Sequence, residues 1–326
     1  MQKRRIQLFF TVIIFSSLVA CKTSEPIPPI VPIAVPATPT PVVIAQPSAP
    51  VAVIIPVPTV KPLRHIKIGL ALGGGAARGF AHVGVIKALE SQGIDAEIVT
   101  GTSAGSLVGA LYAAGNNGFA LQKIALSMDE ATFSDWKVPL FADSTGVLKG
   151  EGLQNFVNKE VHQVPIEKLK RSFGAVATDL NTGLPILFQR GNTGAAVRAS
   201  SAVPGVFQPV RIGDKLYVDG GLVAPVPVSF SRMMGADFVI AVNISSQPDS
   251  EAWSSSLNIL MQTFSIMGQT INKYELQGAD VVIRPELADM KGQDFGGRHT
   301  AILAGERATM DAMPEIKRKL KEMQEK

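Results

Sequence analysis

The chain has 326 residues, enough for one large domain or two small ones, with 46% apolar residues and a formal net charge of +4. Lys3, Arg4 and Arg5 supply three of the excess positive charges, so the remaining chain is close to neutral and no nucleic-acid partner is expected. A single cysteine excludes a disulfide within the chain and a cysteine-based metal site.

The N-terminus has the pattern of a cleaved signal peptide, residues 1–20. A charged start precedes an apolar run, residues 6–18, which is shorter than the about 20 residues of a membrane-spanning helix. The run ends in Leu18-Val19-Ala20-Cys21, which resembles a bacterial lipobox with cleavage before Cys21 and acylation of that cysteine. Because Lys22 follows instead of an aspartate, the resemblance implies anchoring to the outer membrane, facing the periplasm. A free or buried Cys21 is the alternative.

Residues 21–63 predict an extended tether between this anchor and a folded domain at 64–326. They hold 12 of the 22 prolines and few charges. Proline fixes φ and lacks an N–H donor, so the segment has no helical option. At about 3.1 Å per residue it would reach on the order of 120 Å. A proline-rich ligand for a partner module is the alternative.

The folded domain opens with a predicted strand at 65–72, a glycine-rich turn and a predicted helix at 80–92. The turn is Gly73-Gly74-Gly75-Ala76-Ala77-Arg78-Gly79. It lacks the Gly-Lys-Ser/Thr ending of a P-loop. A dinucleotide loop would have glycine in place of Arg78, although Asp95 lies at a suitable distance for that interpretation. The third interpretation is an oxyanion hole, because adjacent glycines let backbone N–H groups approach a tetrahedral oxygen closely.

The next predicted strand and helix, 96–100 and 106–114, enclose a Gly-x-Ser-x-Gly sequence. Ser103 stands between Gly101 and Gly105. A strand, a tight turn carrying serine and a helix are the context of a nucleophile elbow, and an ordinary glycine-rich turn is the alternative. Because consecutive parallel strands often lie side by side, we expect this turn and the first glycine-rich turn to open on the same sheet edge.

The rest of the chain alternates between helices and strands. Further helices are predicted at 119–128, 152–160, 193–201, 228–234, 253–275 and 300–325, the last with Pro314 as a point where it could break. Strands are predicted at 173–178, 184–189, 237–243 and 279–284, with a hairpin at 210–212 and 216–218. Irregular structure is predicted at 132–150, either covering an apolar cleft or packing against the domain. This alternation predicts an α/β layered fold with a largely parallel sheet.

The predicted helix at 253–275 has apolar residues at helical spacing. They are Leu257, Leu260, Met261, Phe264, Met267 and Ile271. Such spacing is typical of a helix with one face in the core, and a lipid-facing surface is the alternative. The last predicted helix instead mixes lysines with glutamates, as at Lys317 and Glu322, which indicates a solvated face.

An aspartate ends the predicted hairpin, in Asp219-Gly220-Gly221. Alone, this sequence fits an Asx-type turn. Together with the glycine-rich turn and the Ser103 motif, it resembles the patatin-like phospholipase family, particularly its bacterial members. Residues 198–209 also resemble the family segment that precedes the aspartate. The resemblance covers about residues 66–245 and rests on three separated motifs.

The resemblance implies a three-layer patatin-like α/β fold, a largely parallel central sheet flanked by helices, and hydrolysis of lipid acyl esters. Ser103 would attack the acyl carbon, and Asp219 would accept its proton as the base of a Ser-Asp dyad. Gly74 and Gly75, in a loop shaped by Gly73 and Arg78, would bind the oxyanion. No cofactor or metal is implied, and the sequence shows no cluster of metal ligands.

Two alternatives to the dyad enzyme remain open. Ser103, Asp219 and His299 follow the chain order of a conventional Ser-His-Asp triad in α/β-hydrolases, whereas His65, His82 and His162 are expected to be structural or solvated. A catalytically inactive lipid-binding lipoprotein is the other alternative. A dinucleotide-binding enzyme would leave the serine and aspartate motifs without a role.

Overall fold

The computed structural model describes residues 64–128, 148–246, 255–287 and 290–325. The signal peptide, Cys21, the proline-rich tether and most of segment 132–150 lie outside the described residues, so their assignments stay predictions. Among the described helices, none combines the length and the apolar composition needed to cross a membrane.

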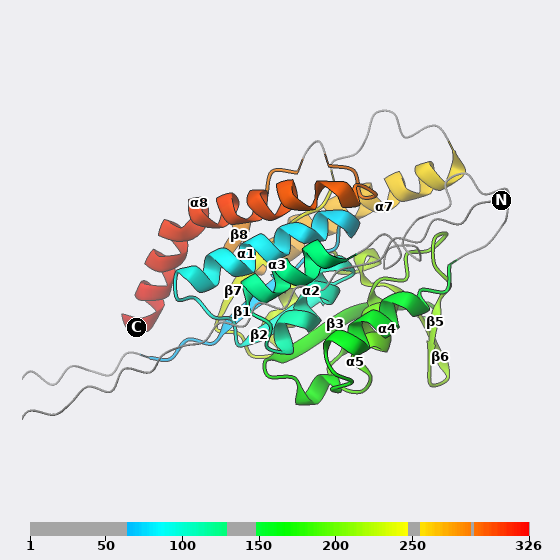
Figure 1. Ribbon diagram of the computed structural model, residues 1–326, viewed down its shortest axis with the longest axis horizontal. Helices are drawn as coiled ribbons and strands as arrows, with labels where there is room; N and C mark the ends of the chain where they lie inside the picture. Colours follow the sequence, from blue (N-terminus) through cyan, green and yellow to red (C-terminus); the bar gives the residue numbers. More distant parts are fainter. Residues whose placement is uncertain (1–63, 129–147, 247–254, 288–289, 326) are drawn as a thin grey trace, which may run out of the picture. The chain divides into compact units, whose positions relative to one another are not determined.

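A central sheet of eight strands organises the domain (Figure 1). The strands are β1 Ile68–Leu72, β2 Ile98–Thr102, β3 Ser172–Asp179, β4 Pro185–Phe188, β5 Val210–Ile212, β6 Lys215–Asp219, β7 Phe238–Val242 and β8 Val281–Ile283. Their order is β5-β6-β3-β2-β1-β7-β8, with β4 also paired to β3. Strands β3, β2, β1, β7 and β8 are parallel, whereas the β3–β4, β3–β6 and β5–β6 pairs are antiparallel.

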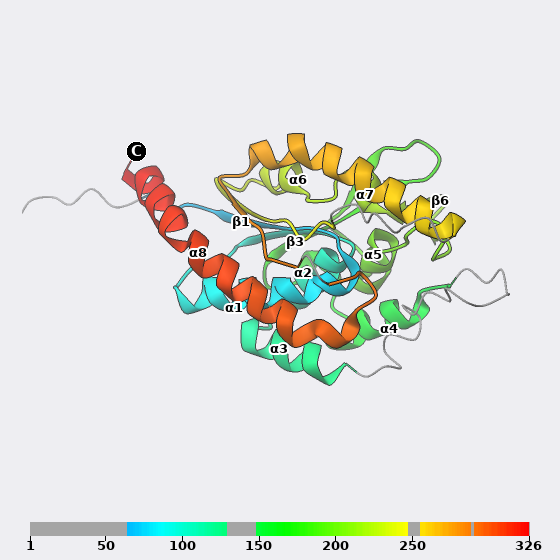
Figure 2. The ribbon, with the colours of Figure 1, turned by 90° about the horizontal axis from the view of Figure 1, so that it is seen from above.

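Helices cover both faces of this sheet. They are α1 Phe80–Ser91, α2 Ala104–Ala113, α3 Gly118–Ser127, α4 Glu151–Glu160, α5 Thr193–Ser200, α6 Val228–Met233, α7 Ser256–Glu275 and α8 Arg298–Glu325. Figure 2 shows α6 and α7 on one side of the sheet and α1, α3 and α8 on the other. The predicted three-layer α/β fold with a mostly parallel central sheet is therefore confirmed.

Burial on both faces explains the composition of the central strands. Every residue of β2 and β7 is buried, and so is β1 after its first residue. Their sequences are accordingly continuous runs of apolar or small residues instead of alternating ones. Parallel strands end at the same edge, and Leu72 of β1 pairs with Gly101 of β2. The turns that follow β1 and β2 therefore meet, as predicted.

Two helices differ from their predictions. α8 runs unbroken through Pro314 to Glu325, and Figure 1 shows it bending in its C-terminal part, as a proline inside a helix can cause. α7 was predicted to bury one apolar face, but Gly268 and Asn272 are its buried residues. Of its six predicted apolar residues, Leu257, Met261, Phe264 and Ile271 are partly buried, the first two against the apolar cluster around Phe207, whereas Leu260 and Met267 are exposed.

Candidate active site

Ser103 occupies a strained turn between β2 and α2. Its backbone has φ 52° and ψ −122°, a conformation that non-glycine residues rarely adopt. Such a conformation costs about 1–3 kcal/mol and persists where the surrounding structure holds it. Ser103 directly precedes α2, so the N-terminal end of that helix dipole lies beside the serine. This is the strand, turn and helix arrangement of a nucleophile elbow.

The two glycines of the serine motif let the turn close. A Cβ on Gly101 would collide with the Gly105 carbonyl oxygen, and a Cβ on Gly105 would collide with the carbonyl oxygens of Leu72 and Gly73. A side chain at Gly101 would therefore push the start of α2 away from the end of β2, and one at Gly105 would push it away from the end of β1. The motif requires glycine for close backbone approach at both positions, because neither has a positive φ.

Strand β3 brings Asp219 to the elbow. Val176 of β3 pairs with Thr102, the residue before Ser103, and the adjacent Ala177 pairs with Asp219. The Asp219 carbonyl accepts a hydrogen bond from Thr178 Oγ1 at 2.8 Å. A Cβ on the following residue, Gly220, would collide with the Val176 carbonyl oxygen, which explains glycine at that position. Sheet register thus places together two side chains that are distant in sequence.

The Asp219 carboxylate is buried, and within the described residues only one of its two oxygens has a hydrogen-bond partner. Oδ1 accepts the Gly221 N–H at 2.6 Å, whereas Oδ2 is buried with no hydrogen-bond partner in the described part of the chain. Burial raises the pKa of Asp219 to about 6, against the lowering effects of the Gly221 N–H and the nearby Ser103 hydroxyl. The Ser103 hydroxyl lies close enough to the carboxylate to lower its pKa but makes no full hydrogen bond to it, as is common for catalytic pairs without substrate. The carboxylate beside the serine therefore has one oxygen, Oδ2, that is free to take a proton.

No histidine hydrogen-bonds Ser103 or Asp219 within the described ranges. His299 is exposed on the first turn of α8, and His162 is exposed after α4. His65 is also exposed and lies 2.8 Å from Glu97. Nor do the described residues contain a group of three or more His, Cys, Asp or Glu side chains that could hold a metal ion. The group that the fold brings to the serine is a carboxylate.

The glycine-rich loop after β1 differs in one respect from its prediction. The Gly73 N–H donates to the Val242 carbonyl at 3.0 Å, and the Gly74 N–H donates to the Pro225 carbonyl at 2.9 Å. Gly74 is therefore no free donor in this conformation, and its predicted role in binding an oxyanion is corrected. Its small size still matters, because a Cβ there would lie 3.3 Å from Ser103 Cβ.

The N–H groups of the loop that are free to donate lie just after Gly74, at Gly75 and Ala76. Among the described residues, the N–H groups of Gly75 and Ala76 have no backbone or side-chain acceptor. Ala76 has a φ of 49° and begins a 3-10 turn, Ala76–Gly79, that leads directly into α1. Two adjacent unpaired N–H groups at the start of a helical segment form a site for a negatively charged oxygen. Gly75 keeps its predicted role as a donor, and Ala76 was missed because a positive φ at alanine has no sequence signal.

Arg78 supports this loop and is buried beside it. Its N–H donates to the Gly75 carbonyl at 3.1 Å, which agrees with its predicted part in shaping the loop. The residue is 6% exposed, and its Nε has no partner within the described residues. Burial lowers the pKa of Arg78 to about 10, so the guanidinium stays charged at neutral pH. The loop therefore has a buried positive charge close by.

His82 fixes the first residue of the loop. The ring is completely buried, and its Nε2 lies 2.7 Å from the Gly73 carbonyl oxygen. Burial lowers the pKa of His82 to about 4, so the ring is neutral at pH 7, and the carbonyl assigns its proton to Nε2. The expectation of a structural histidine is met, with the added detail that it holds the glycine-rich loop.

Ser200 is a site residue that sequence reasoning missed. Its Oγ accepts the Ser103 N–H at 3.0 Å and donates to the Val176 carbonyl at 2.5 Å. The backbone N–H of the nucleophile is thus occupied and does not serve as an oxyanion donor. The segment around Ser200 had been singled out for its resemblance to the family, but nothing in its residue types indicated this bond.

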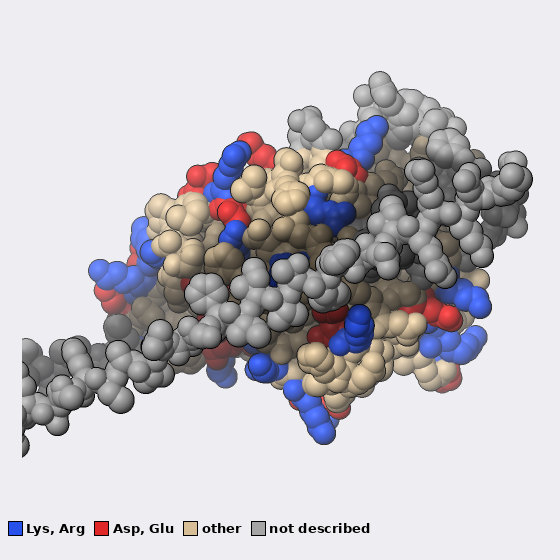
Figure 3. Space-filling view, in the orientation of Figure 1, with Lys and Arg blue, Asp and Glu red and all other residues tan. Residues whose placement is uncertain are grey.

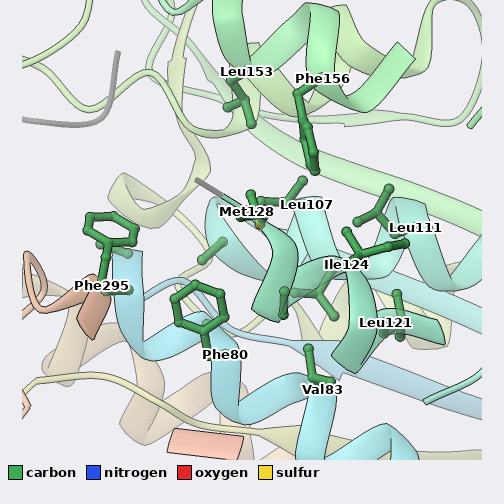
Figure 4. Close-up of a pocket in the computed structure, with 16 residues that line it drawn as sticks. Phe80, Val83, Leu107, Leu111, Leu121, Ile124, Met128, Leu153, Phe156 and Phe295 are labelled. Carbon is green, nitrogen blue, oxygen red and sulfur yellow. The ribbon is translucent and has the colours of Figure 1, made fainter. Parts of the chain in front are cut away.

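An apolar pocket opens beside the loop and the elbow (Figure 4). It is narrow, with a cavity volume of about 50 Å³. Figure 4 shows Phe80 and Phe295 at one end, Leu111 and Leu121 at the other, and a side formed by α4. Ala76, which carries one of the free donors, and Ala104, which follows Ser103, also line it. No lining residue is charged, so the pocket suits an aliphatic chain.

Comparison with known proteins identifies the family. Residues 70–230 match the model of the patatin-like phospholipases. The chain belongs to the patatin-like phospholipase family. The glycine-rich loop, Ser103 and Asp219 all lie inside the matched range.

Curated relatives agree with this membership. An uncharacterized NTE family protein of Mycobacterium tuberculosis is 37% identical over 202 residues, 62% of this chain and 55% of the relative. Patatin-like phospholipase domain-containing protein 6 of Mus musculus is 29% identical over 230 residues, 69% of this chain and 16% of that protein. The chain thus spans about half the length of the first of these relatives and much less of the second.

A solved structure supports the patatin-like fold. VipD from Legionella pneumophila aligns with a TM-score of 0.51 and 13% sequence identity, covering 76% of this chain and 67% of VipD. At that identity the likeness concerns the fold alone. Any activity of this family member must be argued from its own site.

Proposed function

We propose that the protein is a serine hydrolase of lipid acyl esters, with Ser103 as the nucleophile and Asp219 as the base. The observation that carries this proposal is the buried, unpartnered Oδ2 of Asp219 beside a serine in a nucleophile elbow. Serine is a weak nucleophile until a neighbouring base removes its proton. Membership of the patatin-like phospholipase family supports a lipid ester as substrate.

The reaction would proceed in two halves. Asp219 Oδ2 takes the proton of Ser103 as the serine oxygen attacks the acyl carbon, and the tetrahedral oxyanion forms against the N–H groups of Gly75 and Ala76. Asp219 then gives the proton to the leaving alcohol, which leaves an acyl group on Ser103. Water, deprotonated by Asp219, attacks the acyl carbon, and the proton returns to Ser103 as the fatty acid leaves.

The apolar pocket would hold the acyl chain during this reaction. Four of its residues, Ala104, Leu107, Val108 and Leu111, recur on one face of α2. That face extends for about 10 Å from the serine, at 1.5 Å per residue. A chain in contact with it would be removed from water along several methylene groups, each contributing about 0.8 kcal/mol.

Val108→Phe is expected to shorten the acyl chains that the enzyme accepts. The larger ring would fill the middle of the pocket, so a long chain would lose the contacts beyond it. We expect kcat/KM for palmitoyl esters to fall about ten- to a hundredfold, the equivalent of two to four lost methylene contacts. Acetyl and butyryl esters should be cleaved at nearly the wild-type rate, which also controls for folding. Equal losses for short and long chains would contradict the assignment.

The pH dependence of hydrolysis should report Asp219. A general base works only when it is deprotonated, and burial raises the pKa of this carboxyl to about 6. kcat/KM should therefore increase with pH and be half-maximal at about pH 6, instead of at about pH 4 as for an ordinary carboxyl group. Rates on a soluble short-chain ester between pH 4 and 8 would measure this. A rate that stays constant down to pH 4 would exclude Asp219 as the base.

The proposed activity is tested by releasing fatty acid from a phospholipid and a lysophospholipid with the wild-type protein and Ser103→Ala. Wild-type hydrolysis that is absent in Ser103→Ala supports a serine hydrolase. A folded wild-type protein that hydrolyses neither lipid nor a soluble ester would instead favour the inactive lipid-binding alternative. The products also identify the acyl position that is cleaved.

Attachment to the outer membrane through an acylated Cys21 is part of the proposal and rests on the sequence. It predicts a mature chain that begins at Cys21 and carries acyl groups. The mass of the protein purified from membranes measures both features. A mature mass without acyl groups would contradict the anchor.

A further inference from the structure

The outward face of α7 is apolar and uncharged. From Ser256 to Asn272 the helix has no Asp, Glu, Lys or Arg. Its exposed large apolar residues are Ile259, Leu260, Ile266, Met267 and Tyr274, each between 37% and 73% exposed. Residues seven apart lie on the same side of a helix, so Ile259 and Ile266 form one column, and Leu260, Met267 and Tyr274 form a second.

The hydroxyl groups on this face are satisfied by the helix itself. Thr263 Oγ1 donates to the Ile259 carbonyl at 2.9 Å, and Thr270 Oγ1 donates to the Ile266 carbonyl at 3.2 Å. Both threonines are exposed. Because their hydroxyls turn toward the backbone, Thr263 between the two isoleucines and Thr270 beyond Ile266 add little polar surface to this face.

Helix α8 provides the contrast. Leu303 and Met310 are exposed to a similar extent, 49% and 46%, but Glu306, Arg307 and Asp311 stand among them. Figure 3 shows charges of both signs along α8. Single apolar residues between charges are ordinary for a protein surface, whereas a contiguous uncharged face marks a contact with another apolar surface.

Positive charge follows the apolar face at the C-terminal end of α7. Lys273 is exposed and stands seven residues after Ile266, on the same column. With Arg284, which follows β8, it lines a polar pocket at that end of the helix. In the parts of the chain that the structure describes, neither side chain has an ion-pair partner. Apolar residues next to unpaired cations are typical of helices that lie on anionic membrane surfaces.

The packed side of α7 contacts segments that carry the proposed catalytic residues. α7 packs against Gly220–Leu222, the 3-10 turn that directly follows Asp219. At its other end, Leu257 and Leu260 pack against Gly205, where a Cβ would lie 3.1–3.3 Å from them. Gly205 lies in the segment that also carries Ser200, which accepts the Ser103 N–H. α7 therefore contacts both the turn that follows Asp219 and the segment that carries Ser200, on the side of the sheet opposite to α1 and α3 (Figure 2).

We propose that the outward face of α7 docks the domain on an anionic lipid surface. Ile259, Ile266 and Met267 would enter the acyl boundary, Tyr274 would lie at the headgroup level, and Lys273 with Arg284 would contact anionic headgroups. The choice of a lipid surface over a protein partner rests on the proposed function, whereas the docking itself can be measured without catalysis.

The chain's single cysteine makes a site-specific test possible. In full-length protein carrying Cys21→Ser and Ser103→Ala, Ile266→Cys is labelled with an environment-sensitive fluorophore, and Leu303→Cys is the matched control on α8. Vesicles of phosphatidylcholine and phosphatidylglycerol are added, with and without nitroxides on the acyl chains. The proposal predicts that the label at position 266 shifts to the blue and is quenched by the nitroxides, whereas the label at 303 does neither. Since all variants keep the same N-terminus, its own affinity for lipid cannot cause this difference.

Two results would overturn the proposal. Equal responses at the two positions would show that α7 does not enter the bilayer. A label at position 266 that is already shielded before vesicles are added would mean that a second copy or the chain's own tether covers the face.

The cations and the activity give independent readouts. Lys273→Gln combined with Arg284→Gln should weaken binding to anionic vesicles about ten- to thirtyfold, without affecting binding to phosphatidylcholine alone.

With Ser103 present, Ile266→Glu should lower the rate of hydrolysis of vesicle phospholipid about tenfold and leave the rate of hydrolysis of a soluble short-chain ester unchanged. Leu303→Glu should change neither activity. An unchanged vesicle rate in folded Ile266→Glu would contradict the docking role.

Discussion

Asp219→Asn is expected to reduce ester hydrolysis by about 10³-fold or more while the protein stays folded. The asparagine side-chain oxygen can still accept the Gly221 N–H that Asp219 Oδ1 accepts in the structure. The second position, Oδ2, becomes an amide nitrogen that cannot take a proton from Ser103. Hydrolysis of a soluble short-chain ester, with thermal melting as the folding control, measures the loss.

The comparison variant is His299→Ala. His299 is exposed on α8, and nothing in the described structure hydrogen-bonds it to the serine or the aspartate. We therefore expect its removal to change kcat less than twofold, in contrast to Ser103→Ala, which should match Asp219→Asn. A folded His299→Ala protein with background activity would replace the dyad by a conventional triad, because the members of a triad act as a unit.

Gly75→Ala is expected to lower kcat about 10²- to 10³-fold, the usual effect of losing one oxyanion donor. The φ of Gly75, 169°, lies outside the left-handed region that favours glycine, so the effect of alanine is argued from the space around its Cβ. The obstacle is Ile244, whose Cδ1 would lie 2.7 Å from the new Cβ. Either the loop or Ile244 must shift, and a shift of the loop moves the N–H groups of Gly75 and Ala76 away from the oxyanion.

A second substitution separates this effect from a general defect. Ile244→Val removes Cδ1 but keeps Cγ1, which would lie 3.0 Å from the new Cβ, so the double variant Gly75→Ala with Ile244→Val should regain part of the activity that Gly75→Ala loses. Ile244→Val alone, a small reduction of a buried side chain, should remain close to wild type. If Gly75→Ala retains full activity, or if the second substitution rescues nothing, the loop is not the oxyanion hole.

The fold could be predicted because its strongest signals are local. Strands buried on both faces, such as β1 and β7, are unbroken apolar or small runs bounded by turns. The glycines at 101 and 105 could also be predicted from the local sequence, because the turn at Ser103 brings backbone atoms too close to leave room for a Cβ. Ser103 and Asp219 were found through the resemblance of three motifs to the family, and their meeting depends on the register of β3, which the sequence does not specify.

The features that could not be predicted depend on contacts between distant segments. The Gly74 N–H is not a free donor because it donates a hydrogen bond to the Pro225 carbonyl. Ser200 is held near the elbow because its hydroxyl donates to the Val176 carbonyl of β3. The surface position of α7 was missed for a related reason. Apolar spacing identifies a helix, but it does not say whether the apolar residues meet the protein core or another apolar phase.

The central claim, that Asp219 activates Ser103, is tested most directly by covalent labelling with a fluorophosphonate. The reagent bonds to the oxygen of an activated serine and releases fluoride, and the mass of the modified peptide identifies the residue. The account predicts labelling of Ser103 in the wild-type protein and in His299→Ala, with a rate that is half-maximal at about pH 6, and no labelling in folded Asp219→Asn. Labelling of Ser103 in Asp219→Asn at the wild-type rate, or its loss in His299→Ala, would contradict the account.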